Sequence, residues 1–398
     1  MGVGDGARGK LEDMASQAGS THTADVIVIG GGLIGSSIAF RLAQERLKVL
    51  VLDRGEPGAE ASAAAAGMLA PQGETIEPDD FFTFCAESHA LYPDFVDEIE
   101  GSMGRDVGYR REGTVLVAVN EEESAALEKI YQAQSRYGLI IERLTPEAVH
   151  QKVAGLSTEI RFGLEIPRDH WVDNERLTQA VIQAAKGLGA RFLAGTPVVK
   201  LNARNSRVES LEACTGATSA VSRFSAGSIV LAAGSWSGEL AASLGISLPV
   251  KPCRGQMLEF EAPRELPCVV RSGHHYLVPR ASNRIVVGTT AEYAGFEKAV
   301  TGAGLQSVLQ GALRIAPFLA DCKFRRAWAG LRPDTADHLP VLGFGEFENL
   351  AFATGHFRNG ILLAPITAQV IWELMIKGQS SRSVGSYSPA RFVSAGSS

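Results

Sequence analysis

A glycine-rich turn near the N-terminus is the chain's clearest chemical feature. The apolar run 26–29 has the length of a strand, and it leads into Gly30-x-Gly32-x-x-Gly35, which a helical pattern follows. In such a turn Gly30 permits the bend, Gly32 lets a pyrophosphate approach the backbone, and Gly35 lets helix and strand pack closely. The N–H groups at the helix start would face the anion. The pattern therefore predicts a dinucleotide site.

A second strand pattern, at 49–52, ends in the acid that such a site needs. Asp53 follows Gly35 at close to the spacing of about 20 residues at which a carboxylate binds the adenosine ribose hydroxyls. The alternative is a glycine-rich turn in another α/β protein, but the added strand, helix and acid favour dinucleotide binding. The chain has one such fingerprint, whereas enzymes that pass electrons between a flavin and NAD(P)H usually need a second dinucleotide fold. The substrate should therefore be the electron donor.

Further elements must hold this turn in place. Strand patterns cluster between 250 and 329, which predicts an antiparallel sheet, and α/β patterns lie on both sides of that region. The strand at 228–231 ends in Ala232-Ala233-Gly234, a turn that could also approach the pyrophosphate, although an ordinary connection would look similar. Helical spacing is found at 79–100, 121–137, 174–188, 305–315 and 361–375, and further strand patterns at 114–119, 191–193, 198–201, 256–260, 276–278, 285–287 and 350–353.

Length and composition fit a soluble protein of two domains. The chain has 398 residues and a net charge of -6, which provides no basic surface for nucleic acid. No stretch approaches the roughly 18 consecutive apolar residues of a membrane span. The five cysteines are widely spaced and form no CxxC pair, so we expect free thiols in the cytoplasm and no metal site. Residues 1–23 lack an apolar leader and should be a flexible tail, and the Ser-rich residues 381–398 should be a loose one.

Seven segments spread along the chain carry a resemblance to a known family. They are Ile27–Ser36, Ser62–Leu69, Thr196–Val198, Ala233–Ser237, His274–Arg280, Trp328–Pro333 and Gly355–Pro365. Through them roughly residues 24–378 resemble the flavoprotein amine oxidases, the family of D-amino acid oxidase and sarcosine oxidase. Within that family the chain is most similar to the glycine oxidases of thiamine biosynthesis. A match at so many ordered segments is more specific than any single motif.

The resemblance implies a bound FAD and a two-domain fold. We expect a mixed α/β protein in which residues 24–105, 172–248 and 334–380 form a Rossmann-type FAD-binding domain. Residues 106–171 and 249–333 should form a substrate-binding domain with a large antiparallel or mixed sheet. No cysteine lies at 326–330, where sarcosine oxidases attach their flavin, so the FAD should be non-covalent. The family tends to form homotetramers.

The resemblance also assigns cofactor contacts residue by residue. The loop and helix start after Gly355 should lie under the flavin pyrimidine, where a helix N-terminus stabilises the negative charge of the reduced ring. The residues expected at the cofactor are Gly30, Gly32, Leu33, Ile34, Gly35, Asp53, Arg54, Ala61, Ser62, Ala66, Gly67, Met68, Val198, Ala233, Gly234, His356, Phe357, Arg358, Asn359, Gly360, Ile361 and Leu362.

For the substrate, Arg332 matches the family's carboxylate-binding arginine, since a guanidinium fork suits a carboxylate. The alternative for Arg332 is a structural pair with Asp334 or Asp337. Tyr276 matches a tyrosine that joins the carboxylate contact, and His274, two residues earlier on the same strand face, should point into the same cavity. Each could instead be a packed core residue.

Three other positions bear on the pocket. Arg358 corresponds to an arginine near flavin and pocket, with a role in holding its own loop as the alternative, and Met68 should lie beside the substrate. Where glycine oxidases carry a pocket methionine this chain has Ala291, so the cavity should be wider and accept substrates larger than glycine.

The resemblance implies oxidative deamination of glycine, sarcosine or small D-amino acids. A hydride would pass from the substrate Cα to flavin N5, and O2 would be reduced to H2O2, with no protein residue as catalytic base. The glycine imine would supply the thiazole of thiamine. Two rivals stay open: a D-amino acid dehydrogenase that reduces a quinone, and a flavin-binding protein without turnover.

Overall fold

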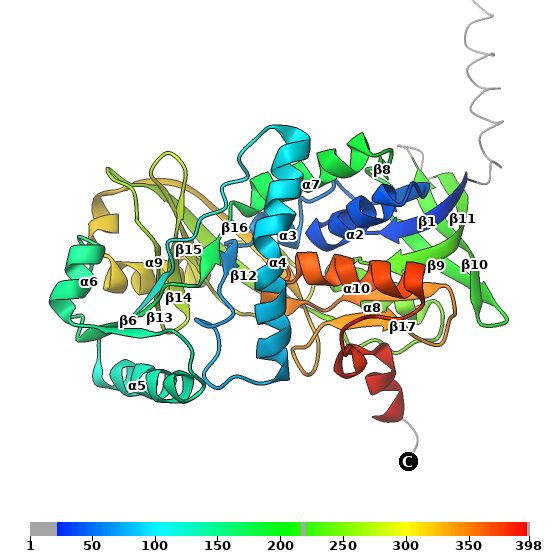
Figure 1. Cartoon of the computed structure of the whole chain (residues 1–398). Helices are drawn as coiled ribbons and strands as arrows, with labels where there is room; N and C mark the ends of the chain where they lie inside the picture. The colour runs from blue at the N-terminus through cyan, green and yellow to red at the C-terminus, as the bar shows by residue number, and fades with distance from the viewer. Residues whose placement is uncertain (1–21, 216–219, 396–398) are drawn as a thin grey trace, which may run out of the picture.

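Two large sheets lie side by side in the computed structural model, which describes residues 22–215 and 220–395 (Figure 1). The first sheet has the order β17-β18-β11-β1-β2-β8, and β18, β11, β1, β2 and β8 run parallel. Antiparallel β9 and β10 extend it beside β11. Its strands are β1 (His22–Ile29), β2 (Val49–Leu52), β8 (Arg191–Leu193), β9 (Val198–Arg204), β10 (Arg207–Thr215), β11 (Ala220–Leu231), β17 (Val341–Phe344) and β18 (Leu350–Thr354).

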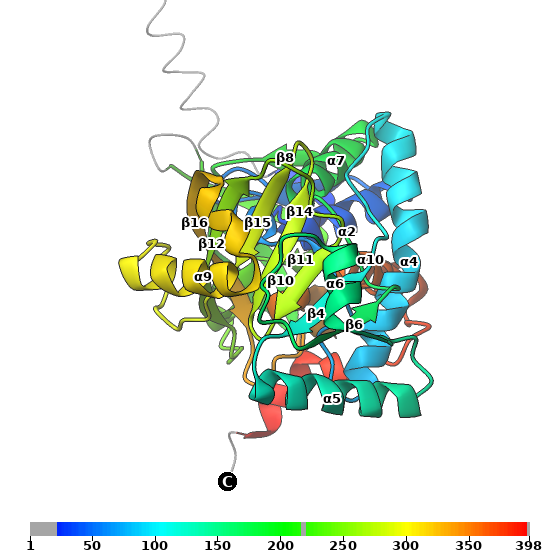
Figure 2. The same cartoon turned by 90° about the vertical axis from the view of Figure 1, so that its left-hand side faces the viewer.

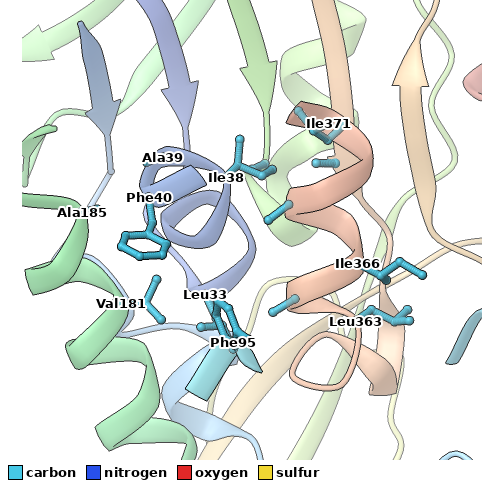
Figure 3. Packing of buried hydrophobic residues seen from close by; sticks show 14 of the residues in the cluster. Leu33, Ile38, Ala39, Phe40, Phe95, Val181, Ala185, Leu363, Ile366 and Ile371 are labelled. Carbon is cyan, nitrogen blue, oxygen red and sulfur yellow. The ribbon is translucent and has the colours of Figure 1, made fainter. Parts of the chain in front are cut away.

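Four helices bury one face of this sheet. The helices are α2 (Leu33–Gln44), α4 (Asp80–Met103), α7 (Asn174–Gly187) and α10 (Ala364–Lys377). Because side chains alternate along a strand, Val26 and Val28 of β1 join the helix-side core, whereas Ile27 and Ile29 join the core on the opposite face. Figure 3 shows α2 and α10 packing side by side through residues such as Ile38 and Ile371.

The second sheet is mixed, with the order β16-β12-β15-β14-β13-β4-β6-β5. Its one parallel pair is β13 with β4, in which Val270 lies opposite Val115. Helices α5 (Glu121–Arg136), α6 (Pro146–Lys152) and α9 (Gly302–Ile315) surround it (Figure 2). Its strands are β4 (Thr114–Ala118), β5 (Glu142–Leu144), β6 (Phe162–Ile166), β12 (Lys251–Glu261), β13 (Val269–Ser272), β14 (His275–Arg280), β15 (Arg284–Gly288) and β16 (Lys323–Asp334).

Short elements connect the two sheets. The segment after β2 forms α3 (Ala61–Ala64) and β3 (Met68–Leu69), which pairs with β7 (His170–Trp171). A further short helix, α8 (Ser237–Ala242), follows β11. The expected mixed α/β fold class is confirmed. The helices within residues 22–215 and 220–395 include none with the length and apolar character of a membrane span.

Both chain ends differ from expectation. Strand β1 begins at His22, so the N-terminal tail predicted for residues 1–23 cannot extend through Thr23, and residues 1–21 lie outside the described part. The C-terminal tail, predicted to be loose over 381–398, is packed in its described part around Tyr387 and Arg391. The Tyr387 ring is buried 4.6 Å from that of Phe84, and Arg391 forms an ion pair with Asp337 at 2.8 Å.

Candidate active site

One cavity, of about 1080 Å³, is lined by elements of both sheets. The β1–α2 turn, the end of β2 and the segment around α3 line one end. The start of β14, the loop after β15, the C-terminal end of β16 and the loop after β18 line the other. We call these the nucleotide end and the substrate end. The volume is at the upper limit of ordinary ligand pockets, roughly 300–1,000 Å³, as a large cofactor with a small substrate would need.

The glycine turn forms the wall of the nucleotide end. Gly30, Gly32, Leu33 and Ile34 line the cavity, and Gly32 is the N-cap of α2 without a side-chain cap. Gly35 does not line it: a Cβ there would overlap the Gly30 carbonyl, so its absence allows the close helix–strand packing. The turn thus offers main-chain N–H groups at a helix start, which suits an anion.

Asp53 ends β2 at the same wall. Its carboxylate accepts hydrogen bonds from the Gly31 N–H at 2.7 Å and the Gly55 N–H at 2.8 Å. Burial raises the pKa of Asp53, while these two hydrogen bonds act in the opposite direction. Since a carboxylate has about four acceptor positions, hydroxyl donors from a ribose can still bind.

Small residues and a cation–π pair complete the nucleotide end. Val198, Ala233 and Gly234 line it, as does Arg54. The Arg54 guanidinium lies 4.2 Å from the centre of the Trp236 ring, a cation–π contact that the sequence did not reveal.

The segment that should lie alongside the flavin is divided between the cavity and the protein interior. Ala61, Ser62 and Met68 line the cavity. Ala66 and Gly67 do not: the Ala66 carbonyl accepts a hydrogen bond from Arg280, and the Gly67 carbonyl accepts one from the Val172 N–H. We therefore assign the latter two residues to holding the segment in place.

The loop after β18 is similarly divided. His356, Phe357, Arg358, Gly360 and Ile361 line the cavity, whereas the cavity wall does not include Asn359 and Leu362. Helix α10 begins at Ala364, after a 3-10 turn at 357–359, and not at Ile361 as the sequence predicted. Hydroxyls of α4 hold this loop, since Ser88 donates to the Leu362 carbonyl and Tyr92 to the Ile361 carbonyl, both at 2.6 Å.

Arg332 lies at the substrate end without a carboxylate partner in the described part of the chain. It donates to the Thr289 hydroxyl at 2.7 Å and to the Thr290 carbonyl at 3.1 Å. The structural pairs considered for it do not form. Asp334 instead accepts from Tyr293 and pairs with His338, and Asp337 pairs with Arg391. A Cβ at Gly255 would overlap the guanidinium, so the glycine makes room for it. Arg332 can therefore offer its positive charge to a ligand.

Tyr276 is buried close to this guanidinium. Its hydroxyl lies 3.4 Å from the Met257 sulfur, and both residues line the cavity. Burial raises the pKa of Tyr276, so the phenol stays protonated and can donate a hydrogen bond. A Cβ at Gly288 would overlap the hydroxyl, which makes that glycine the counterpart of Gly255.

A charge cluster that the sequence did not reveal lies beside Arg358. The Glu74 carboxylate pairs with Arg358 at 2.8 Å and with Arg271 at 3.4 Å, and all three residues line the cavity. Burial would raise the pKa of Glu74, but the two arginines outweigh it and hold the pKa below its usual range. Arg358 thus both approaches the pocket and anchors its loop. Glu74 lies in a loop with no periodic pattern, so no local signal identified it.

Two further predicted residues lie at the cavity wall. His274 is exposed and lines the cavity. The sequence placed it on the strand of Tyr276, but it lies in the turn between β13 and β14. Ala291 lines the cavity directly after Thr290, next to the loop that Arg332 holds. Its small side chain leaves space there.

Known proteins with the same fold bear on this site. The family model described as "FAD dependent oxidoreductase" (DAO) matches residues 25–374. The glycine oxidase of Geobacillus kaustophilus is 32% identical to the chain, over 94% of the chain and 98% of the relative. A crystal structure of glycine oxidase from that organism superposes with a TM-score of 0.87 at 31% identity, covering 93% of this chain and 99% of that one. The chain therefore belongs to the FAD-dependent oxidoreductase family.

A second kind of relative is longer than this chain. The bifunctional protein ThiO/ThiG of Trichormus variabilis is 36% identical over 93% of the chain, but the chain spans only 55% of that relative. The family explains the cavity: the glycine turn, the Asp53 carboxylate and the small residues around Ala61 fit FAD at the nucleotide end.

Proposed function

We propose that the protein is an FAD-dependent oxidase of small amino acids, with glycine as the first candidate substrate. The balanced reaction is glycine + O2 + H2O giving glyoxylate, ammonia and H2O2, through the imine. The observation that carries the proposal is Arg332, a guanidinium that lines the cavity and has no carboxylate partner among the described residues. The similarity of the whole chain to proteins named glycine oxidase supports the choice of substrate.

The residues of the substrate end would bind and orient the amino acid. FAD, when bound, supplies a hydride acceptor at N5. Arg332 would hold the substrate carboxylate through a charge-assisted contact, and the Tyr276 hydroxyl would donate a further hydrogen bond to it. The apolar side chains of Met68 and Met257 would exclude water from the reacting carbon. We assign no catalytic base, so the amine must reach the site unprotonated and the rate should rise with pH.

The width of the pocket sets the proposed substrate range. Because Ala291 lines the cavity, we expect sarcosine and small D-amino acids to be oxidised beside glycine. An Ala291→Met variant should lower kcat/KM for D-alanine more than for glycine. We expect the ratio of the two kcat/KM values to change about tenfold, the discrimination that one methylene group in a pocket usually provides. An unchanged ratio would show that Ala291 does not limit the pocket.

One experiment tests the activity and separates it from its rivals. The FAD-loaded protein is mixed with glycine without oxygen, and absorbance near the visible flavin maximum is followed. We expect the yellow colour to bleach, and readmitted O2 to restore it with one H2O2 per glyoxylate. Bleaching that only a quinone or dye reverses would instead establish a dehydrogenase. No bleaching by glycine, sarcosine or D-alanine would refute the proposal.

The biological setting is part of the same proposal. Relatives that carry the printed name ThiO/ThiG favour a supply of glycine imine for the thiazole of thiamine. All five cysteines are free thiols, which agrees with a reducing compartment such as the cytoplasm. A deletion strain that grows without thiamine as well as its parent does would contradict this setting, but not the oxidase activity.

A further inference from the structure

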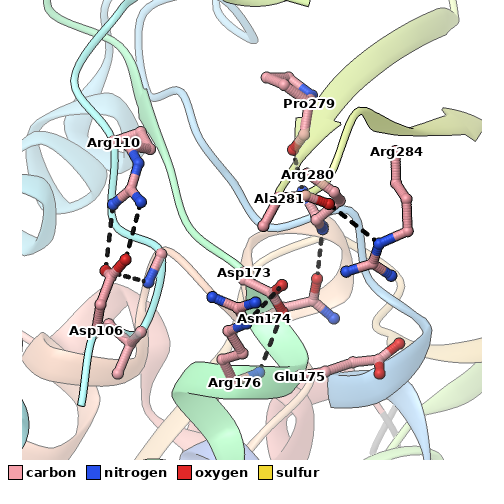
Figure 4. Close-up of polar contacts among 12 residues, drawn as sticks. Asp106, Arg110, Asp173, Asn174, Glu175, Arg176, Pro279, Arg280, Ala281 and Arg284 are labelled. Atoms are coloured by element: carbon pink, nitrogen blue, oxygen red, sulfur yellow. Dashed lines mark hydrogen bonds and ion pairs between the residues drawn. The ribbon is translucent and has the colours of Figure 1, made fainter. Parts of the chain in front are cut away.

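A buried guanidinium lies behind the segment that lines the cavity at Ala61 and Ser62. Arg280, the last residue of β14, is 7% exposed. It donates to the Ala66 carbonyl at 2.6 Å. It also donates to the Asn174 side-chain oxygen at 2.8 Å (Figure 4). No carboxylate of the described residues lies within ion-pairing distance of it, and burial lowers the pKa of Arg280. Burying a charged guanidinium without an ion pair costs free energy of folding, so we expect Arg280 to have a role that offsets this cost.

Asn174 continues this contact toward the cofactor segment. The Asn174 side chain is 1% exposed, and its amide N–H groups donate to the Ser62 carbonyl at 2.7 Å and the Ala63 carbonyl at 3.1 Å. Arg280 can only donate and the two carbonyls can only accept, so the orientation of the amide is determined. All of its hydrogen-bonding groups therefore act between Arg280 and the segment.

The chain of contacts ends at the glycine turn. The Ser62 hydroxyl accepts a hydrogen bond from the Leu33 N–H at 2.8 Å, at the first residue of α2. Strand β14, which ends in Arg280, also carries Tyr276 at the substrate end. One series of hydrogen bonds thus connects a strand of the substrate sheet to the turn where the FAD pyrophosphate would bind.

We propose that Arg280 and Asn174 are positioning residues that hold residues 61–67 against FAD and set the cofactor's place relative to the substrate end. We call the pair the Arg280–Asn174 clamp. The proposal rests on the FAD site of the proposed function and not on its substrate. Flavin binding therefore tests it even if glycine proves not to be oxidised.

The chain offers a matched control for a test of the clamp. Arg284 lies opposite Arg280 across the β14–β15 hairpin, but it pairs with Glu259 at 2.7 Å. It also donates to the Ala281 carbonyl (Figure 4), and among the described residues it has no hydrogen bond to residues 61–67. Arg280→Met and Arg284→Met remove the same charge from neighbouring sites. Asn174→Ala breaks the contact to Ser62 while the guanidinium stays in place.

The measurement is the FAD dissociation constant of the deflavinated protein, followed by the change in flavin fluorescence. We expect Arg280→Met and Asn174→Ala to raise the constant about tenfold or more, as for a lost hydrogen bond to a charged or buried group. Arg280→Lys should recover part of the loss, and Arg284→Met should stay within about twofold of the parent.

Melting temperatures with and without FAD separate positioning from general stability. A positioning role predicts that Arg280→Met reduces the rise in melting temperature caused by FAD, with a smaller effect on the flavin-free protein. Equal FAD affinity in Arg280→Met and Arg284→Met, or a loss confined to the flavin-free protein, would overturn the proposal. If Arg280→Met does not fold, the FAD affinity of Asn174→Ala decides.

Discussion

The two ends of the cavity are built in different ways. The nucleotide end uses mainly main-chain groups and small residues, such as the turn at Gly30 to Gly32, the segment at Ala61 and Ser62, and Ala233. The substrate end uses charged and aromatic side chains from strands and loops far apart in sequence, such as Tyr276 and Arg332. Shape should therefore dominate cofactor binding, and charge should dominate substrate binding.

Added bulk at the nucleotide end should have the largest effect. In Gly32→Val the new Cβ would lie 3.2 Å from the Ser62 hydroxyl oxygen, and the branched side chain would enter the space that Gly32 lines. We expect FAD affinity to fall by about a hundredfold or more, equivalent to roughly 3 kcal/mol. Gly187→Ala is the control, because a Cβ at Gly187 meets no atom within 4 Å. Equal FAD affinity in both variants would show that shape does not control this end.

Neutralising a charge at the substrate end should come next in size. Glu74→Gln keeps the side chain's shape but leaves Arg271 and Arg358 without their shared carboxylate. We expect the free energy of unfolding of the FAD-loaded protein to fall by about 2 kcal/mol, less than for a fully buried pair because Arg358 is partly exposed. The control is Glu261→Gln, an exposed carboxylate paired with Arg325. If urea unfolding gave the two variants equal losses of unfolding free energy, the charge cluster would stabilise the protein no more than an exposed ion pair does.

The smallest effect, taken over one pH unit, concerns the protonation of a buried histidine. Burial lowers the pKa of His356 to about 3, and its ring lies 3.0 Å from the Thr367 hydroxyl. Between the unfolded value near 6.5 and this folded value, the unfolded chain binds the extra proton, so stability falls as pH drops through that window. The slope for this group approaches about 1.4 kcal/mol per pH unit.

A histidine replacement tests that slope. His356→Asn should flatten the fall in unfolding free energy between pH 6.5 and 4 relative to the parent. Parallel curves for the parent and His356→Asn would contradict the assignment.

The same contrast explains what the sequence could predict. The glycine turn and Asp53 form a local pattern with a mechanism, so the nucleotide end was recognisable without a structure. At the substrate end, Arg332 and Tyr276 emerged only through the resemblance, because nothing in their immediate sequence shows that β14 and β16 bring them together. Glu74 was missed because its role depends on Arg271, which is distant in sequence.

Strand β16 shows why a whole element can be missed. Its residues Lys323–Asp334 form an edge of the second sheet and carry several charges and a proline. Edge strands tolerate such residues, since one side of the ladder is unpaired and one face is often wet. The alternation that marks a buried strand is therefore absent from its first half, which is largely exposed.

The most direct test of the account is the steady-state kinetics of Arg332→Met with glycine, alongside measurement of its bound FAD. Arg325→Met, an exposed arginine on the same strand, is the control. We predict a KM for glycine raised about a hundredfold or more, as for a lost charge-assisted pair, with FAD content and visible spectrum unchanged. An unchanged KM would contradict the account, because Arg332 would then not hold the substrate.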